Sequence, residues 1–582
     1  MATQGQTDMR PDSLKGLQSA VIVIFLLSFV GLQAVGMVFK TPLGAPPDER
    51  AHLSYIHDVI QPGGWLPDYR AGEIYLMEDN INYLMHPPLY YIAMGVVGSL
   101  AGWDVYAQVH QFRLLNVAIV LIGLAFFIGF CRRMELNWTV TSVLTLSLTA
   151  VPMFAYYAGS VNNDNLVYTA VAIVLFGLAQ GAARSPHPSA SALLPGFGWV
   201  AVGYTIAALT KVTAGAFLTF FLLFYLLLEW RRLSLFFQQS AFWVSAFGAV
   251  LVVGGYYLFA HWQYGSFLPS PRYLYVLTPP EDLMTFSEYA QEFWRFMTTR
   301  ASGVMAHISF TPMIGVAVKF YHWMFLGPLL VWLILRFIPA FRHPDPTRTR
   351  LADSLVLAVL ALLALHLHIG YGAYSNTGVL GGMQPRYYLY LAPLVLAPAF
   401  FLLKRHEIQT LLALPLAALV IISFWASVPF AQERQYIEIS GRHPPLVFKT
   451  DESEWPVEIQ GVDMRLRLQT DLVGSLDEFW LERDVVYARG WVFDKSDNQP
   501  VTRVMLMLQD EVIGSRASNI SRPDVRAALA LPQAERTGFT FYTYGIPEDT
   551  ELCEISLLVE FQDGSHGVME PGECTQWIFL SE

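Results

Sequence analysis

The sequence predicts a multispanning α-helical membrane protein that ends in an all-β domain. Its 582 residues are 54% apolar and only 14% charged, whereas soluble proteins carry about 25% charged residues. Apolar stretches of about 17 to 25 residues, the length that crosses a bilayer, recur over the first three quarters of the chain. The last quarter instead alternates apolar and polar residues with the period of β-strands.

About eleven apolar stretches have the length of transmembrane helices. They cover residues 19–39, 112–131, 138–157, 165–183, 193–210, 213–230, 241–261, 319–338, 352–370, 387–403 and 409–428. The segment 88–103 is also apolar but is short, because Asp104 ends it. We therefore expect it to form an interfacial or re-entrant helix in the first outer loop.

Basic residues at the ends of these stretches predict the orientation. With eleven spans and a cytoplasmic N-terminus, many basic residues near the membrane ends fall on the cytoplasmic side, as the positive-inside rule requires. These residues are Arg10, Lys15, Arg132, Arg133, Arg184, Arg231, Arg232, Arg336, Arg342, Arg348, Arg350, Lys404 and Arg405. We expect a multi-pass protein of the cytoplasmic (inner) membrane whose C-terminal domain is periplasmic or extracellular. A signal peptide cleaved near "AVG" is the alternative interpretation of the first stretch.

A change in charge near residue 431 separates the two domains. Residues 431–582 carry 27 acidic and 13 basic residues, whereas residues 1–430 carry 20 acidic and 23 basic residues. We expect a transmembrane domain over 1–430 and an extracytoplasmic β-sandwich over 431–582, with strands in "DVVYARGWVFD", "TRVMLMLQDEVIG", "GFTFYTYG" and "CEISLLVEFQDG". Cys553 and Cys574 lie in the second domain and either form a disulfide or stay as two free thiols.

The outer loop after the first stretch carries an acidic pair, in "APPDERAHLSYIHD". On a helix, Asp48 and Glu49 would point about 100° apart, so that one can face a cavity while the other caps the helix or pairs with a base. The alternative is that Asp48 is only the N-cap of an interfacial helix. His52 follows in the same segment, and His86 lies in "NYLMHPPLYYI".

Polar residues also stand where later stretches begin or end at the outer face. Asn162, Asn163 and Asp164 belong to "VNNDNL", which either caps a helix or binds sugar hydroxyls or a cation. Lys211 lies between two apolar runs, where a lysine needs an anionic partner such as a phosphate or reaches to water. No zinc spacing, phosphate-binding glycine loop or nucleic-acid patch is evident.

Two arginines at the outer face are candidate anion ligands. Arg386 begins the tenth stretch in "QPRYYLYLAPL", against the positive-inside trend, and a guanidinium binds phosphate oxygens in bidentate geometry. Arg272 in "SPSPRYLYV" is a second candidate in the long loop 262–318, where it is otherwise only a loop residue.

Over residues 19–430, the chain resembles integral membrane glycosyltransferases of the GT-C superfamily. The resemblance rests on the order of five features along the chain: the acidic pair, "HPPLYY", the Asn/Asp cluster, the outer lysine and "RYY". Within this superfamily the chain resembles aminoarabinose, protein O-mannosyl and cell-wall arabinosyl transferases. The tail, through "RGWVFD" and "RPDV", resembles β-sandwich modules attached to some surface-polysaccharide glycosyltransferases.

This resemblance implies a polyprenyl-phosphate-linked sugar as donor, and a glycan, lipid or protein hydroxyl as acceptor. It implies that Asp48, or else Glu49, is the catalytic base. Lys211, Arg386 and Arg272 would bind the donor phosphate. The residues that would bind substrate are His52, His86, Asn162, Asn163, Asp164 and Tyr387.

Some members of the superfamily use a divalent cation, but this sequence shows no diagnostic ligand spacing, so no metal is assigned. A transporter or flippase of lipid-linked sugars is one alternative, although no internal repeat supports it. A non-catalytic subunit for glycan assembly is another.

Overall fold

The structure is a computed structural model. It describes residues 12–40, 49–60, 86–105, 108–149, 151–182, 190–268, 283–299, 315–338, 343, 345–377, 385–403, 405–436, 446–448, 472–482, 485–508, 511–518, 520–544 and 554–571. Among the described residues, those up to Gln435 form one compact unit and those from Tyr436 onward form the other. The described part before this point is helical, and the described part after it consists mainly of strands.

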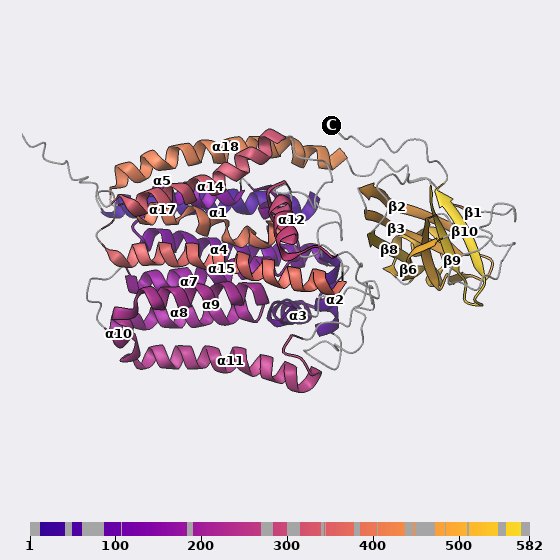
Figure 1. Cartoon of the computed structure of the whole chain (residues 1–582), viewed down its shortest axis with the longest axis horizontal. Coiled ribbons are helices and arrows are strands. Elements are labelled where there is room, and N and C mark those ends of the chain that lie inside the picture. Colours follow the sequence, from indigo (N-terminus) through magenta and orange to yellow (C-terminus); the bar gives the residue numbers. More distant parts are fainter. Residues whose placement is uncertain are drawn as a thin grey trace, which may run out of the picture. The chain divides into compact units, whose positions relative to one another are not determined.

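The helical unit contains long helices joined by short ones (Figure 1). Its helices are α1 (Asp12–Lys40), α2 (Glu49–Ile60), α3 (Leu89–Ala101), α4 (Val109–Arg133), α5 (Trp138–Thr149), α6 (Pro152–Ala158), α7 (Asp164–Ala182), α8 (Ala190–Ala208), α9 (Val212–Leu228), η1 (Trp230–Arg232), α10 (Leu233–Phe237), α11 (Ser240–Tyr264), α12 (Phe286–Thr299), α14 (Gly315–Phe337), α15 (Pro346–Thr377), η4 (Pro385–Leu391), α16 (Ala392–Leu396), α17 (Pro398–Phe401) and α18 (His406–Tyr436). The elements η1 and η4 are 3₁₀ helices.

Each predicted apolar stretch overlaps at least one helix, but the number of spans is not confirmed. Among the described residues, four helices are long and apolar enough to cross a membrane, namely those in Gly16–Phe39, Val109–Arg133, Ser240–Tyr264 and Pro346–Ser375. A fifth span results if α9 and the following Trp230–Phe237, which are bent by 75°, are counted as one.

Two predicted stretches are broken at prolines. The third divides between α5 and α6, and Pro152 is the first residue of α6. The tenth divides between α16 and α17, and Pro398 is the first residue of α17. Proline has no N–H to continue the preceding helix, so it favours a new start at these positions. The predicted short helix over 88–103 is confirmed as α3, which ends at Gly102 with a left-handed φ of 66°.

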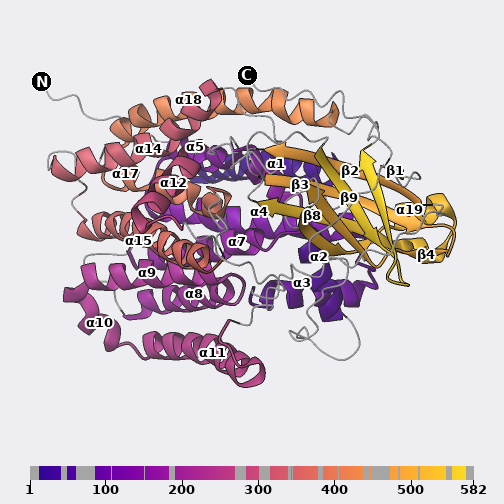
Figure 2. The same cartoon turned by 45° about the vertical axis from the view of Figure 1, so that its right-hand side comes forward.

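Helices α7, α8 and α9 run side by side, and α11 lies at the outer edge of the helical unit (Figure 1, Figure 2). Helices α7 and α8 approach each other closely at two glycines: a Cβ atom on Gly177 would lie 2.8 Å from the carbonyl oxygen of Gly196. Small residues of this kind allow close helix packing in membranes. On α11, large apolar side chains such as Trp243 and Phe247 are exposed.

The unit after Gln435 contains two antiparallel sheets (Figure 1). Their strands are β1 (Leu446–Phe448), β2 (Leu472–Glu482), β3 (Val485–Asp494), β4 (Gln499–Pro500), β5 (Arg503–Leu508), β6 (Glu511–Ala517), β7 (Ile520–Ser521), β8 (Arg536–Tyr544), β9 (Ile555–Glu560) and β10 (His566–Pro571). One sheet has the order β1-β10-β9-β5-β6, and the other has the order β2-β3-β8-β7 with β4 beside β3. The strands expected in the four alternating segments are confirmed as β3, β5 with β6, β8 and β9.

Both sheets contribute to one apolar core. Ala488 and Phe539 from one sheet pack in the same buried cluster as Val504 and Leu557 from the other. A short helix, α19 (Pro523–Leu529), and a 3₁₀ turn, η6 (Pro532–Glu535), connect β7 to β8. The cysteines Cys553 and Cys574 lie outside the described residues, so the expected pairing stays a prediction.

Candidate functional site

The starts of several helices meet at one end of the helical unit. The first residue of α3, Leu89, donates its backbone N–H to the carbonyl oxygen of Leu209, just past the end of α8, over 3.0 Å. Both views show α3 beyond this end of α8 (Figure 1, Figure 2). Helix starts carry unpaired N–H groups and the positive end of the helix dipole. The region therefore suits negatively charged and hydrogen-bond-accepting groups.

Glu49 and Arg113 form a buried ion pair in this region. The Arg113 Nε donates to Glu49 Oε1 over 2.8 Å, and Nη2 donates to Oε2 over 2.5 Å. The two side chains are 1% and 0% exposed. Glu49 Oε1 also accepts the backbone N–H of Val161 over 2.9 Å, and Arg113 Nη1 donates to the carbonyl oxygen of Val38 over 2.8 Å. Arg113 thus joins the end of α1 to the start of α2.

The predicted residues His52 and Asn163 meet at Tyr91. His52 Nδ1 lies 2.9 Å from the hydroxyl of Tyr91, and Asn163 Nδ2 donates to the same hydroxyl over 3.3 Å. The ring of Tyr55 stacks on Tyr91 with 3.8 Å between centroids, and its hydroxyl donates to the carbonyl oxygen of His86 over 3.2 Å. The acidic-loop helix, the "HPPLYY" segment and the Asn/Asp cluster are therefore in contact.

A second buried polar group centres on Asn116. Its Oδ1 accepts the hydroxyl of Tyr90 over 2.9 Å and Nδ2 of Asn165 over 3.0 Å. Burial raises the pKa of Tyr90 far above its ordinary value, although the hydrogen bond to Asn116 acts in the opposite direction. The phenol therefore stays protonated and donates to the amide.

Asp164 and Lys211 form the second ion pair of the site. Lys211 Nζ donates to Asp164 Oδ1 over 2.6 Å, and the two side chains are 10% and 15% exposed. The ammonium also lies over the ring of Tyr387 in η4, 5.4 Å from the centroid. Asn162 Oδ1 accepts the backbone N–H of Asp164 over 2.8 Å, so Asn162 caps the start of α7. The need of Lys211 for an anionic partner is met by Asp164.

The structure thus gathers most of the predicted site residues at one end of the helical unit. The residues that it brings together are Glu49, His52, His86, Asn162, Asn163, Asp164, Lys211 and Tyr387. Asp48 and Arg272 lie outside the described residues, and so does the side chain of Arg386, whose backbone belongs to η4.

Several residues of the site were missed in the sequence. Among them are Arg113, Tyr91 and Asn116. A signal existed for Arg113, because it stands near the outer end of a predicted span, where a basic residue runs against the positive-inside trend. Tyr91 and Asn116 carry no comparable signal, because aromatic and amide side chains are ordinary at helix ends.

Cation ligands are not assembled in the described part of the chain. Groups of three or more His, Cys, Asp or Glu side chains that could hold a metal ion are absent among the residues that the structure describes. Both carboxylates of the site instead bind a basic side chain.

Comparisons with known proteins give a family and a distant structural likeness. The chain is similar to the crystal structure of ArnT from Cupriavidus metallidurans in the apo state, with 16% identity, a TM-score of 0.35, and coverage of 70% of this chain and 78% of that chain. It is also similar to the same protein bound to undecaprenyl phosphate, with 15% identity, a TM-score of 0.32, and coverage of 76% and 83%. The search of curated proteins gives no match.

A family model described as "Predicted membrane protein (DUF2142)" matches residues 73–395. The matched segment contains α3, α4, α7 and α9, which carry much of the site, and it covers more than half of the sequence. The chain therefore belongs to the DUF2142 family of membrane proteins.

Proposed function

We propose that this protein is a membrane glycosyltransferase that moves a sugar from a polyprenyl-phosphate donor to an acceptor hydroxyl, with inversion at the sugar carbon. Residues 1–430 form the transferase domain, with about eleven spans. Residues 431–582 form an extracytoplasmic β-sandwich that binds glycan. The reaction takes place on the outer side of the cytoplasmic membrane, in the synthesis or modification of cell-envelope glycans.

The observation that carries this proposal is the convergence of two ion pairs at the starts of α2, α4, α7 and α9. Arg113 holds Val38 and Glu49, which stand on either side of the segment 41–48. This contact therefore joins α1 and α2 on the two sides of Asp48 in the sequence. The pair of Lys211 and Asp164 lies in the same polar network, because Asn163, next to Asp164, bonds Tyr91 of α3.

Asp48 is the better candidate for the catalytic base than Glu49. The oxygens of Glu49 already accept three N–H donors, two from Arg113 and one from Val161. Both oxygens are thus engaged and the side chain is only 1% exposed, so Glu49 is not placed to reach an acceptor hydroxyl. We therefore assign Glu49 a positioning role and leave proton transfer to Asp48.

Lys211 is the central ligand for the donor phosphate. It is the residue before α9, and the N–H groups of a helix start favour an anion. Tyr387 covers the ammonium, which brings the neighbouring Arg386 backbone close to the same place. Lys211 and Arg386 bind the phosphate oxygens and stabilise their charge when the lipid phosphate leaves, with Arg272 as a further ligand.

In the reaction, Asp48 takes the proton of the acceptor hydroxyl. The hydroxyl oxygen forms a bond to the anomeric carbon, while the bond from that carbon to the phosphate oxygen breaks and its electron pair stays on the phosphate. His52, His86, Asn162 and Asn163 orient the two substrates.

The test is sugar transfer by the purified full-length protein with a polyprenyl-phosphate-linked sugar. Asp48→Asn is expected to lower the transfer rate by at least about a hundredfold, because general base catalysis contributes this much, and to leave donor binding unchanged. Asp104→Asn, at an exposed acidic residue of the same loop, is the matched control. Full activity of Asp48→Asn would remove the base assignment.

The same preparation tests the phosphate ligands. Lys211→Ala and Arg386→Ala are expected to weaken binding of undecaprenyl phosphate, because each removes a charge-assisted contact. Arg231→Ala, at an exposed arginine just past the other end of α9, is the control. Unchanged lipid binding in both variants would exclude the proposed phosphate site.

A further inference from the structure

The side of the site formed by η4 contains hydroxyl groups that the proposed reaction does not use. In a 3₁₀ helix, residues three apart lie above one another. Tyr387 and Tyr390 of η4 are therefore on one face. Tyr387 lies over Lys211, and Tyr390 is close enough to Asp164 to interact with its charge. Both tyrosines thus lie near the pair of Asp164 and Lys211.

The hydroxyls of Tyr390 and Thr213 are buried without a hydrogen-bond partner in the described part of the chain. Tyr390 is only 3% exposed and lies beside Thr213, in the first turn of α9. The two hydroxyls are close enough to interact, but a bond between them would use only one of their two O–H donors. Buried hydroxyls of native proteins almost always have a partner, so the O–H donor that is left beside an ion pair calls for a ligand.

A hydrogen bond holds η4 in this orientation. The hydroxyl of Tyr388, the next residue after Tyr387, lies 2.5 Å from Nδ1 of His366 in α15. Phe217 of α9 packs edge to face on the ring of Tyr390. The face that carries Tyr387 and Tyr390 is therefore fixed from α15 and from α9, and Tyr390 is placed by packing rather than by its own hydroxyl.

The polar groups on this side of the site fit a sugar better than a phosphate. Asp164 uses Oδ1 for Lys211, and a carboxylate accepts hydrogen bonds but donates none. A fully ionised phosphate has no hydrogen to donate to this carboxylate, although its oxygens can still bind Lys211. A sugar hydroxyl, in contrast, donates to the carboxylate and can also accept from the hydroxyls of Tyr390 and Thr213.

We propose that Tyr390 and Thr213, together with Asp164, form the subsite that recognises the sugar hydroxyls of the lipid-linked donor. This inference rests on the proposed function and deepens it, since it separates the sugar subsite from the phosphate ligands Lys211 and Arg386. A site that hydrogen-bonds a substrate hydroxyl discriminates strongly against analogues that lack it. Tyr390 and Thr213 are therefore residues that determine donor specificity.

The experiment measures binding of undecaprenyl phosphate alone and of the same lipid carrying glucose, mannose or arabinose. The variants Tyr390→Phe and Thr213→Val remove one hydroxyl each and keep the shape of the side chain. Each is expected to weaken binding of the preferred sugar lipid about tenfold, the value of one hydrogen bond, and to leave binding of undecaprenyl phosphate alone unchanged. Lys211→Ala is expected to weaken binding of all these lipids.

The matched controls are Tyr168→Phe and Thr145→Val. They also remove buried hydroxyls without a partner among the described residues, but from α7 and α5, and they are expected to leave all affinities unchanged. Equal losses in site and control variants, or unchanged affinity of both site variants for the sugar lipids, overturn this inference alone. Failure of the wild-type protein to bind any of these lipids overturns the proposed function as well.

Discussion

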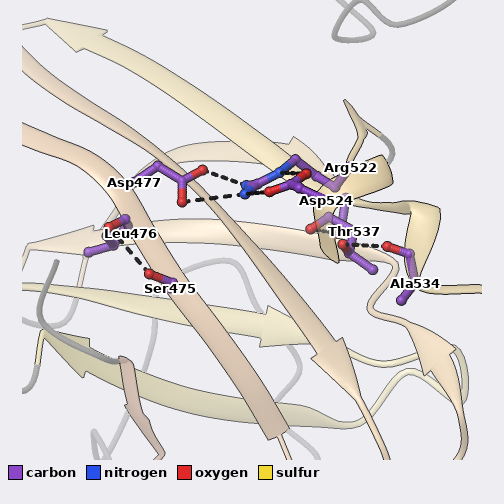
Figure 3. Close-up of polar contacts among 8 residues, drawn as sticks. Ser475, Leu476, Asp477, Arg522, Asp524, Ala534 and Thr537 are labelled. Atoms are coloured by element: carbon purple, nitrogen blue, oxygen red, sulfur yellow. Dashed lines mark hydrogen bonds and ion pairs between the residues drawn. The ribbon is translucent and has the colours of Figure 1, made fainter. Parts of the chain in front are cut away.

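Each of the two units contains a buried arginine held by carboxylates, and the two differ in how much water reaches the pair. Arg113 in the helical unit is 0% exposed, and its carboxylate partner Glu49 is 1% exposed. Arg522 in the β-stranded unit is 9% exposed and binds two carboxylates, Asp477 at 23% and Asp524 at 63% exposure. Figure 3 shows Arg522 between the two aspartates.

The difference indicates different roles. A fully buried pair costs several kcal/mol in lost hydration and adds little net stability, so its presence is better explained by what it positions. Arg113 connects α1 and α2 around the segment that contains Asp48. Arg522 connects β2, which contains Asp477, to the start of α19, and its partners keep part of their hydration. Arg522 therefore stabilises the β-stranded unit locally.

Arg113→Met is expected to have the largest effect. Removing one member of a buried ion pair typically costs about 3–5 kcal/mol, because the other charge stays buried and unpaired. We expect this loss in the free energy of unfolding of the detergent-purified full-length protein, measured with denaturant. Transfer activity should be lost as well, since α1 and α2, which flank Asp48 in the sequence, are no longer joined.

The double variant Glu49→Met with Arg113→Met separates stability from positioning. Since it leaves no buried charge behind, it should recover much of the stability that Arg113→Met loses. Transfer should stay low, because the link between α1 and α2 is still absent. Recovery of both stability and transfer would show that the pair positions nothing.

Arg522→Met is expected to have a smaller and more local effect. Its carboxylate partners are accessible to water once the arginine is gone, so the cost should be about 1–2 kcal/mol. Hydrogen exchange of the full-length protein should show faster exchange in β2 and α19, with the exchange of α4 and α7 unchanged. A loss as large as that of Arg113→Met would contradict the contrast between the two arginines.

The sequence located the helices and strands because their signals are local. Apolar length alone marks α1, α4, α11 and α15, and alternation marks β3, β8 and β9. Apolar length does not mark where a span breaks. The break at Pro398 lies inside an apolar run, so the tenth stretch was predicted as continuous although it is divided into η4, α16 and α17.

The site was only partly predictable, because its partners are far apart in the sequence. Glu49 and Arg113 are 64 positions apart, and Asp164 and Lys211 are 47 apart. The lysine signalled that it needs an anion, since a charge near membrane depth is costly, but nothing local says that Asp164 supplies it. For the acidic pair, the resemblance favours Asp48 over Glu49 as the base, but the contact of Glu49 with Arg113 could not be predicted from the residues around either one.

The smallest expected effect is a pH dependence of the Arg522 contact. Burial raises the pKa of Asp524, but the hydrogen bonds and positive charge of Arg522 lower it by a larger amount. The pKa of Asp524 therefore lies below its ordinary value. A carboxyl whose pKa is lower in the folded state contributes stability above its unfolded pKa of about 3.9, and this contribution is lost as the pH falls through the folded value. Arg522 stays charged throughout and adds no pH dependence of its own.

Amide protection in α19 of the full-length protein, corrected for the intrinsic rate of exchange, should therefore be level from about pH 7 to 5 and fall below about pH 4. In Asp524→Asn the fall in protection with pH should be shallower, because the carboxyl of Asp524 is missing. Protection at neutral pH should be only slightly lower than in the wild type, because Asp524 is largely exposed and a surface pair contributes little stability. Asp497→Asn, at an exposed aspartate in the turn between β3 and β4, should keep the wild-type profile. Identical profiles for wild type and Asp524→Asn would mean that Arg522 is held by Asp477 alone, and the β-stranded unit would then resemble the helical unit in relying on a single carboxylate.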